Sequence, residues 1–191
     1  RLMPISGPGQ RVETAQLSIE PAPDERRDGR DFFGNAISAV AWHRPVEKIA
    51  FCLTARAERA PPPLADLSPP LADLPGQIAG TDLSPGSPQH FLAPSYRIVP
   101  VAEITGFARA AVPEGASVRD AVQAVGHALY RAMKYDAEAT DVGTTPAQAF
   151  AARHGVCQDF TQIMIAGLRA LGIPAGYVSG FLRTYPPPGQ P

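Results

Sequence analysis

Apolar and polar residues alternate through much of the first sixty residues, which is the pattern of half-buried β-strands. The alternation is clearest at residues 15–19 and again at residues 49–53. Between them, Asp31-Phe32-Phe33-Gly34-Asn35 has the composition of a turn and precedes an apolar stretch at residues 36–43. Several short strands separated by turns predict a small antiparallel sheet or sandwich in this part of the chain.

The spacing of apolar residues becomes helical after residue 96. They recur at intervals of three and four in residues 101–111 and again in residues 118–132, which predicts two helices with one apolar face each. Ser117 followed by Asp120 resembles a capping box at the start of the second helix. Thr145-Pro146-Ala147-Gln148 marks the start of a third helix, which is expected to end near Gly155.

A fourth helix is predicted from Cys157 to Leu171, and it is apolar on most sides. A helix without a broad polar face is expected at the centre of a domain. Residues 175–185 read as a strand that ends at a proline-rich segment. Residues 61–94 are also rich in proline and are predicted to be a loop between two parts. We therefore place the domain boundary near residue 95, with a β-rich domain at 1–95 and a helical domain at 96–191.

Composition excludes several classes of function. The 191 residues include 17 basic and 18 acidic residues, for a net charge of −1, and these charges are interspersed. No basic stripe for nucleic acid and no polybasic patch for a membrane surface is present, and no apolar run approaches the ~18 residues of a membrane span. Two cysteines are too few for a disulfide framework and favour a reducing, cytoplasmic location. Without metal-ligand spacing of Cys or His, we expect no metal and no cofactor.

Cys157 opens the fourth helix directly after Gly155-Val156. Backbone N–H groups in the first turn of a helix have no intrahelical partner and favour negative charge, and this setting is one that lowers the pKa of a thiol and makes it nucleophilic. The alternative is a small buried core residue, the usual role of free cysteine. Asp159 suits the positive helix N-terminus and is interpreted as structural. Cys52 lies within a predicted strand and is also interpreted as structural.

A nucleophilic thiol usually needs a histidine base, and the chain offers four histidines. His127 falls on the polar side of its helix, and His43 stands at the end of a strand. His90 lies in the proline-rich loop, while His154 closes the helix before Cys157. Each of these positions has an ordinary structural or solvated role, so none is assigned as the base.

Residues 153–182, which begin Arg-His-Gly-Val-Cys-Gln-Asp-Phe, are similar to the cysteine motif of the bacterial transglutaminase-like superfamily. Residues 135–146 and the Asp31-Phe32-Phe33-Gly34-Asn35 segment also resemble that family, so the resemblance covers nearly the whole chain. It implies an α+β fold: an N-terminal antiparallel β-domain, followed by the helical half of a papain-like core. It also implies that Cys157 is the catalytic nucleophile.

The resemblance further implies thiol chemistry on an amide bond of a protein or peptide substrate, ending in hydrolysis or transamidation. In this family a histidine and then an aspartate follow on later strands. The sequence stops at Pro191 before any such residue, so we expect a fragment that is inactive by itself. The alternative is a non-catalytic module that binds a peptide or protein on the same fold. A strand at 175–185 without its neighbours would be an exposed edge through which the chain could self-associate.

Overall fold

The computed structural model describes residues 3–60 and 68–180. The chain folds as two compact units, one made of Arg1–Leu64 with Val178–Pro191 and the other of Ala65–Tyr177. The first unit contains antiparallel strands and the second contains mainly helices. This confirms the predicted α+β fold, in which N-terminal antiparallel strands precede a helical part.

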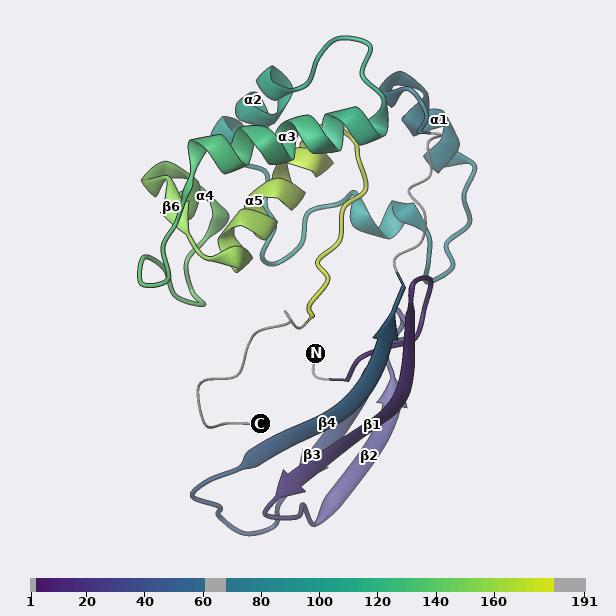
Figure 1. Cartoon of the computed structure of the whole chain (residues 1–191), viewed down its shortest axis with the longest axis vertical. Helices are drawn as coiled ribbons and strands as arrows, with labels where there is room; N and C mark the ends of the chain where they lie inside the picture. The colour runs from purple at the N-terminus through teal and green to yellow at the C-terminus, as the bar shows by residue number, and fades with distance from the viewer. Residues whose placement is uncertain (1–2, 61–67, 181–191) are drawn as a thin grey trace. The chain divides into compact units, whose positions relative to one another are not determined.

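Two antiparallel strand pairs form the described part of the first unit (Figure 1). β1 (Gln10–Glu20) pairs with β4 (Ala50–Arg59), and β2 (Glu25–Arg30) pairs with β3 (Ala36–Ala41). These pairs account for the alternating and apolar segments that predicted strands in the first sixty residues.

The register of β1 and β4 pairs the two alternating segments, residues 15–19 and 49–53, as neighbouring strands. Leu17 lies opposite Leu53, and Ile19 lies opposite Phe51. Cross-strand apolar pairs of this kind stabilise a sheet. Even so, Ile19 is the one buried residue among residues 3–60, so strand pairing contributes more to this unit than a core does.

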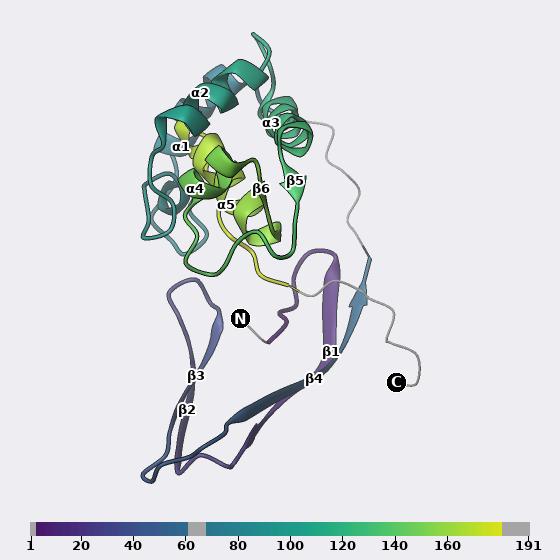
Figure 2. The same ribbon diagram turned by 90° about the vertical axis from the view of Figure 1, so that its left-hand side faces the viewer.

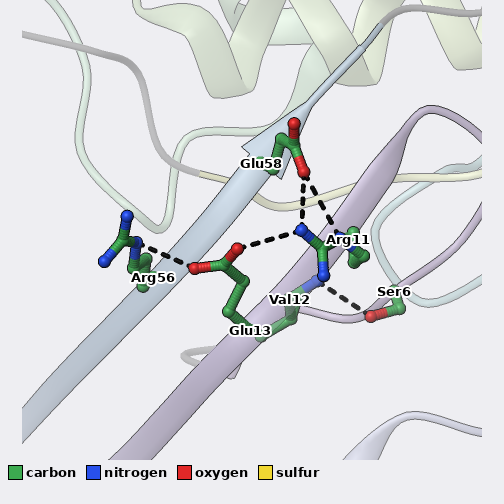
Figure 3. Close-up of polar contacts among 6 residues, drawn as sticks. All are labelled: Ser6, Arg11, Val12, Glu13, Arg56 and Glu58. Carbon is green, nitrogen blue, oxygen red and sulfur yellow. Dashed lines mark hydrogen bonds and ion pairs between the residues drawn. The ribbon is translucent and has the colours of Figure 1, made fainter.

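Charged residues occupy the exposed positions at the open end of the same strand pair (Figure 3). Arg11 forms ion pairs with Glu58 across the strands at 2.9 Å and with Glu13 at 3.0 Å, and Arg56 contacts Glu13 at 2.8 Å. Exposed ion pairs contribute little to stability. Their alternating signs keep like charges on neighbouring strands apart and so favour the observed register.

The sequence does not predict β2, because all six of its residues are exposed and none belongs to an apolar alternation. Polar contacts with β3 hold it instead. Ser38 on β3 donates a hydrogen bond to Asp28 on β2, and this bond, together with Arg26, lowers the pKa of Asp28. The predicted turn closes the pair: Asn35 N–H donates to Asp31 Oδ1 at 2.8 Å, and Gly34 adopts the left-handed φ of 77°.

The second unit packs its helices around α5 (Cys157–Ala170), which contacts α2 (Ala102–Ala111), α3 (Val118–Ala132) and α4 (Pro146–Ala152). Figure 2 shows α5 among these helices. The prediction of a central fourth helix is confirmed. A two-residue parallel pair, β5 (Lys134–Tyr135) with β6 (His154–Gly155), joins the end of α3 to the segment before α5.

The predicted helix starts are confirmed by their caps. Ser117 at the N-cap of α3 accepts a hydrogen bond from the Asp120 N–H at 3.1 Å. At the start of α4, Thr145 accepts from the Gln148 N–H while the Gln148 side chain accepts from the Thr145 N–H, with Pro146 as the first helical residue. These bonds satisfy donors that a helix leaves open at its N-terminus.

The domain boundary differs from the one placed near residue 95, because residues 65–95 belong to the helical unit. Leu71 and Leu74 pack against the core cluster that contains Ala108 and Val125, and the Leu71 N–H donates to the carbonyl of Ala116 at 3.0 Å. The predicted loop also contains three short helical elements: η1 (Leu71–Asp73), α1 (Leu74–Ala79) and η2 (Pro88–Phe91).

The strand predicted at 175–185 is wrong for residues 175–180, which form no strand, and residues 181–185 lie outside the described residues. At the first of these residues, Arg169 takes up the backbone acceptor. Its guanidinium donates to the Ala175 carbonyl at 2.8 and 3.0 Å and to the Ala93 carbonyl at 2.6 Å, and partial burial lowers the pKa of Arg169. The Ala175 N–H donates to Phe91 O. Self-association through this segment stays a prediction, which light scattering can test.

The interface between α5 and its neighbours is close-packed. A Cβ added at Gly167 would lie 3.1 Å from the Ala108 Cβ, so a glycine here lets α5 approach α2. Ile104 and Ile163 are each 1% exposed, and Val125 is 2% exposed. Side chains this well buried set the position of α5, and therefore of the cysteine at its N-terminus.

We expect Ile163→Ala to lower the free energy of unfolding by about 2–5 kcal/mol, because it removes buried methyl groups and leaves a cavity. Urea denaturation measures this loss. Leu83→Ala is the control, since Leu83 is 67% exposed and its truncation should change stability by no more than about 0.5 kcal/mol. Equal effects of the two substitutions would contradict the central position of α5.

Candidate active site

Cys157 is the first residue of α5, and its thiol is free and exposed. The preceding residue, Val156, has extended backbone angles and acts as the N-cap. Cys157 is therefore not a core cysteine, and the alternative interpretation from the sequence does not hold. A thiol at this place meets solvent on one side and the positive end of a fourteen-residue helix on the other.

The backbone around the thiol offers open hydrogen-bond donors. The N–H groups of Asp159 and Phe160 donate to the carbonyl of Val156. Within residues 3–60 and 68–180, the N–H groups of Cys157 and Gln158 have no recorded acceptor. Two such N–H groups beside a nucleophile can stabilise the negative oxygen that forms when a carbonyl is attacked.

Asp159 anchors the first turn from inside the domain. It is fully buried, with 0% of its surface exposed. Its Oδ2 accepts hydrogen bonds from the Val156 N–H at 2.8 Å and from Thr140 Oγ1 at 2.6 Å. These contacts agree with the structural role that the sequence indicates for Asp159. Thr140 lies in the segment that resembles the family, but the sequence assigns it no role, because no local pattern connects this loop residue with Asp159, 19 positions later.

Gly155 fits the same site because it has no side chain. It is buried, and its carbonyl accepts from the Asp136 N–H at 3.0 Å. A Cβ at this position would lie 2.6 Å from Asp159 Oδ2 and 2.9 Å from Asp159 Cβ. Glycine in the motif therefore has a steric explanation: any larger residue would displace either the carboxylate or the strand that leads into α5.

None of the four histidines is positioned as a base for Cys157. Among the described residues, none of them forms a hydrogen bond or an ion pair with Cys157. His43 pairs with Glu25 at 3.2 Å, and His90 Nε2 contacts two loop carbonyls. His127 is exposed on α3, as predicted. His154 Nδ1 lies 3.9 Å from an Asp136 oxygen. His43 and His90 therefore have local partners, whereas His154 lies on β6 after α4 has ended at Ala152, and not at the helix end that the sequence predicts.

Cys52, interpreted from the sequence as a structural residue, lies on β4 opposite Ser18 with its side chain exposed. It therefore provides a second exposed thiol in the same chain, within a strand and not at the first residue of a helix. Among the described residues, no group of three His, Cys, Asp or Glu side chains is arranged to hold a metal ion. The helices described include none that is both long and apolar enough to cross a membrane.

Two family models match the chain. Residues 1–58 match the family described as bacterial transglutaminase-like N-terminal region, and residues 105–187 match the transglutaminase-like superfamily. The chain therefore belongs to the transglutaminase-like superfamily, and the resemblance carried by the motif around Cys157 is confirmed.

Curated relatives include uncharacterised proteins of Mycobacterium bovis and of two strains of Mycobacterium tuberculosis. Each is 33% identical over 206 aligned positions, which cover 99% of this chain and 60% of the relative. The chain thus spans 60% of the length of the curated relatives it matches.

A solved structure shares the fold. It is a crystal structure of a protein from Cytophaga hutchinsonii that is proposed to be a cysteine protease. The TM-score is 0.62 at 20% identity, over 89% of this chain and 56% of that chain. At this identity the likeness shows the fold alone, which is transglutaminase-like and papain-like.

We expect Gly155→Ala to lower the free energy of unfolding by about 1–3 kcal/mol, because the new methyl group overlaps the Asp159 carboxylate. Thermal or urea denaturation provides the measurement. Gly106→Ala is the matched control: Gly106 lies inside α2 and its added Cβ meets nothing within 4 Å, so alanine should stabilise the helix by up to about 1 kcal/mol. A neutral Gly155→Ala would show that Gly155 and Asp159 are not tightly packed.

Proposed function

We propose that this chain is part of a thiol enzyme that acts on amide bonds of a protein or peptide substrate, with Cys157 as the nucleophile. One observation carries the proposal: an exposed thiol stands at the first residue of α5, beside two N–H groups without a recorded acceptor. Membership of the transglutaminase-like superfamily supports it. The absence of a helix able to span a membrane among the described residues is compatible with the cytoplasmic location that we propose.

The reaction divides into two steps. The Cys157 thiolate attacks the carbonyl carbon of the amide, and the carbonyl π electrons move onto oxygen. The N–H of Cys157, and that of Gln158, can donate to this oxyanion. The C–N bond then breaks, the nitrogen leaves as ammonia or an amine after gaining a proton, and a thioester remains. Water converts the thioester to an acid, or a second amine converts it to a new amide, and the thiolate is released.

The base and its orienting acid are not assigned to any of these 191 residues. We propose that the histidine and aspartate that the superfamily resemblance implies are contributed by polypeptide outside this sequence, so that the chain alone is inactive. The curated relatives leave room for such a segment, because this chain spans 60% of their length. Access of water or of an amine to the thioester then decides between hydrolysis and transamidation.

A peptide-binding module without catalysis is the second candidate. One observation favours it: no histidine among the described residues forms a hydrogen bond or an ion pair with Cys157. The two candidates differ in what they require of the thiol, since binding does not need a reactive cysteine and catalysis does.

The reactivity of Cys157 tests the proposal with an internal reference. Cys157 and Cys52 are both exposed, and tryptic peptides 154–169 and 49–56 report on them separately. We expect iodoacetamide at about pH 7 to alkylate Cys157 at least about tenfold faster than Cys52, because only Cys157 lies at a helix N-terminus. Equal rates measured by mass spectrometry would contradict an activated nucleophile and favour the binding module.

Substitution in the longer protein tests catalysis itself. We expect Cys157→Ser to reduce release of ammonia or amine from a peptide substrate by at least about a thousandfold, since the attacking atom is replaced. Cys52→Ser is the matched control and should leave the rate unchanged. Turnover that survives Cys157→Ser would exclude Cys157 as the nucleophile.

A further inference from the structure

We propose that Thr140 and Asp159 are positioning residues, which hold the first turn of α5 so that the Cys157 thiol and its neighbouring N–H groups keep their reactive orientation. This inference rests on the proposed function of Cys157. It extends the active site to a loop residue that acts on the thiol through Asp159. The connection passes through a single carboxylate oxygen, Asp159 Oδ2.

The hydrogen bonds of Asp159 include one that an ordinary helix cap lacks. In a capping box, the side chain at the third helical position accepts from the N-cap N–H, and Asp159 does this with Val156 at 2.8 Å. The second bond is different, because Thr140 reaches Asp159 from a separate loop at 2.6 Å. Caps usually lie at the surface, whereas Asp159 is 0% exposed.

The environment makes the Thr140 bond important for Asp159. A buried carboxylate is stable only when hydrogen bonds replace its contacts with water. Asp159 Oδ1 has no hydrogen-bond partner among the described residues, so the recorded bonds all go to Oδ2. Removing the Thr140 hydroxyl would leave the carboxylate with a single donor, the Val156 N–H.

Close packing transmits such a change to the thiol. Gly155 lies against Asp159 with no room for a methyl group, and it is followed by Val156 and then Cys157. A shift of the carboxylate therefore moves the strand that enters α5 or releases the Val156 N–H. Either change reorients the first turn of α5. The Cys157 thiol would then lie differently in the field of the α5 helix dipole.

The loop that carries Thr140 is itself held in place. The Lys134 N–H donates to Arg153 O at 2.9 Å at one end, and the α4 capping box at Thr145 secures the other. Between these points, Asp141 Oδ1 accepts from the N–H groups of Gly143 and Thr144 at 2.7 and 3.0 Å. The hydroxyl of Thr140 is therefore presented to Asp159 from a fixed backbone.

The test uses the intact 191-residue chain and three threonine substitutions. Thr140→Val removes the hydroxyl and keeps the shape, while Thr140→Ser keeps the hydroxyl. Thr81→Val is the control, because Thr81 Oγ1 also donates a 2.7 Å bond from a partly buried position, but to Ile78 O. For each protein, the ratio of alkylation rates at Cys157 and Cys52 is measured from about pH 5 to pH 9, together with the Tm.

We expect Thr140→Val to lower the Cys157-to-Cys52 ratio at least about fivefold, at a temperature where the protein stays folded. Thr140→Ser should keep the ratio within about twofold of the parent, and Thr81→Val should leave it unchanged while lowering the Tm. A Thr140→Val protein with a lower Tm and an unchanged ratio would overturn the positioning role but leave Cys157 as a reactive nucleophile. A ratio near one in the parent chain would overturn this inference and the proposed function together.

Discussion

The burial of the Asp159 carboxylate is the interaction on which the candidate site depends. A carboxylate without exposure to water needs hydrogen bonds, and Asp159 accepts its two recorded bonds, from the Val156 N–H and the Thr140 hydroxyl, at Oδ2. Because the Val156 N–H is the N-cap donor of α5, satisfying the carboxylate also fixes where the helix begins. The residue at that start is Cys157, so one electrostatic requirement places the thiol.

Packing within the helical unit also fixes the position of Cys157. Ile163 is 1% exposed and Leu168 is 6% exposed, and they anchor α5 among α2, α3 and α4, with Gly167 letting α5 approach α2 closely. The N-terminal turn is exposed at Cys157 while the next turns are covered. A well-packed helix thus carries the proposed nucleophile at its exposed end, which suits covalent catalysis because a fixed nucleophile loses little freedom on attack.

The sequence predicts the features that depend on local patterns. The alternation at 15–19 and 49–53, the caps at Ser117 and Thr145 and the central position of α5 are all observed. It does not predict β2, which is polar and held by its partner strand, or the short helices within the proline-rich segment. The role of Thr140 is not predicted either, because its hydrogen bond with Asp159 is set by the tertiary fold and not by spacing in the sequence. The strand-like pattern of residues 175–180 does not produce a strand, and at Ala175 the backbone N–H and carbonyl bond instead to Phe91 and Arg169.

The central claim is that Cys157 forms a covalent bond with the acyl group of an amide substrate. The most direct measurement is mass spectrometry of the longer protein after brief reaction with a peptide amide and acid quenching. The account predicts an acyl adduct on tryptic peptide 154–169 that hydroxylamine removes, as expected of a thioester. Conversion of the substrate without any adduct on that peptide, or with an adduct elsewhere, would contradict it.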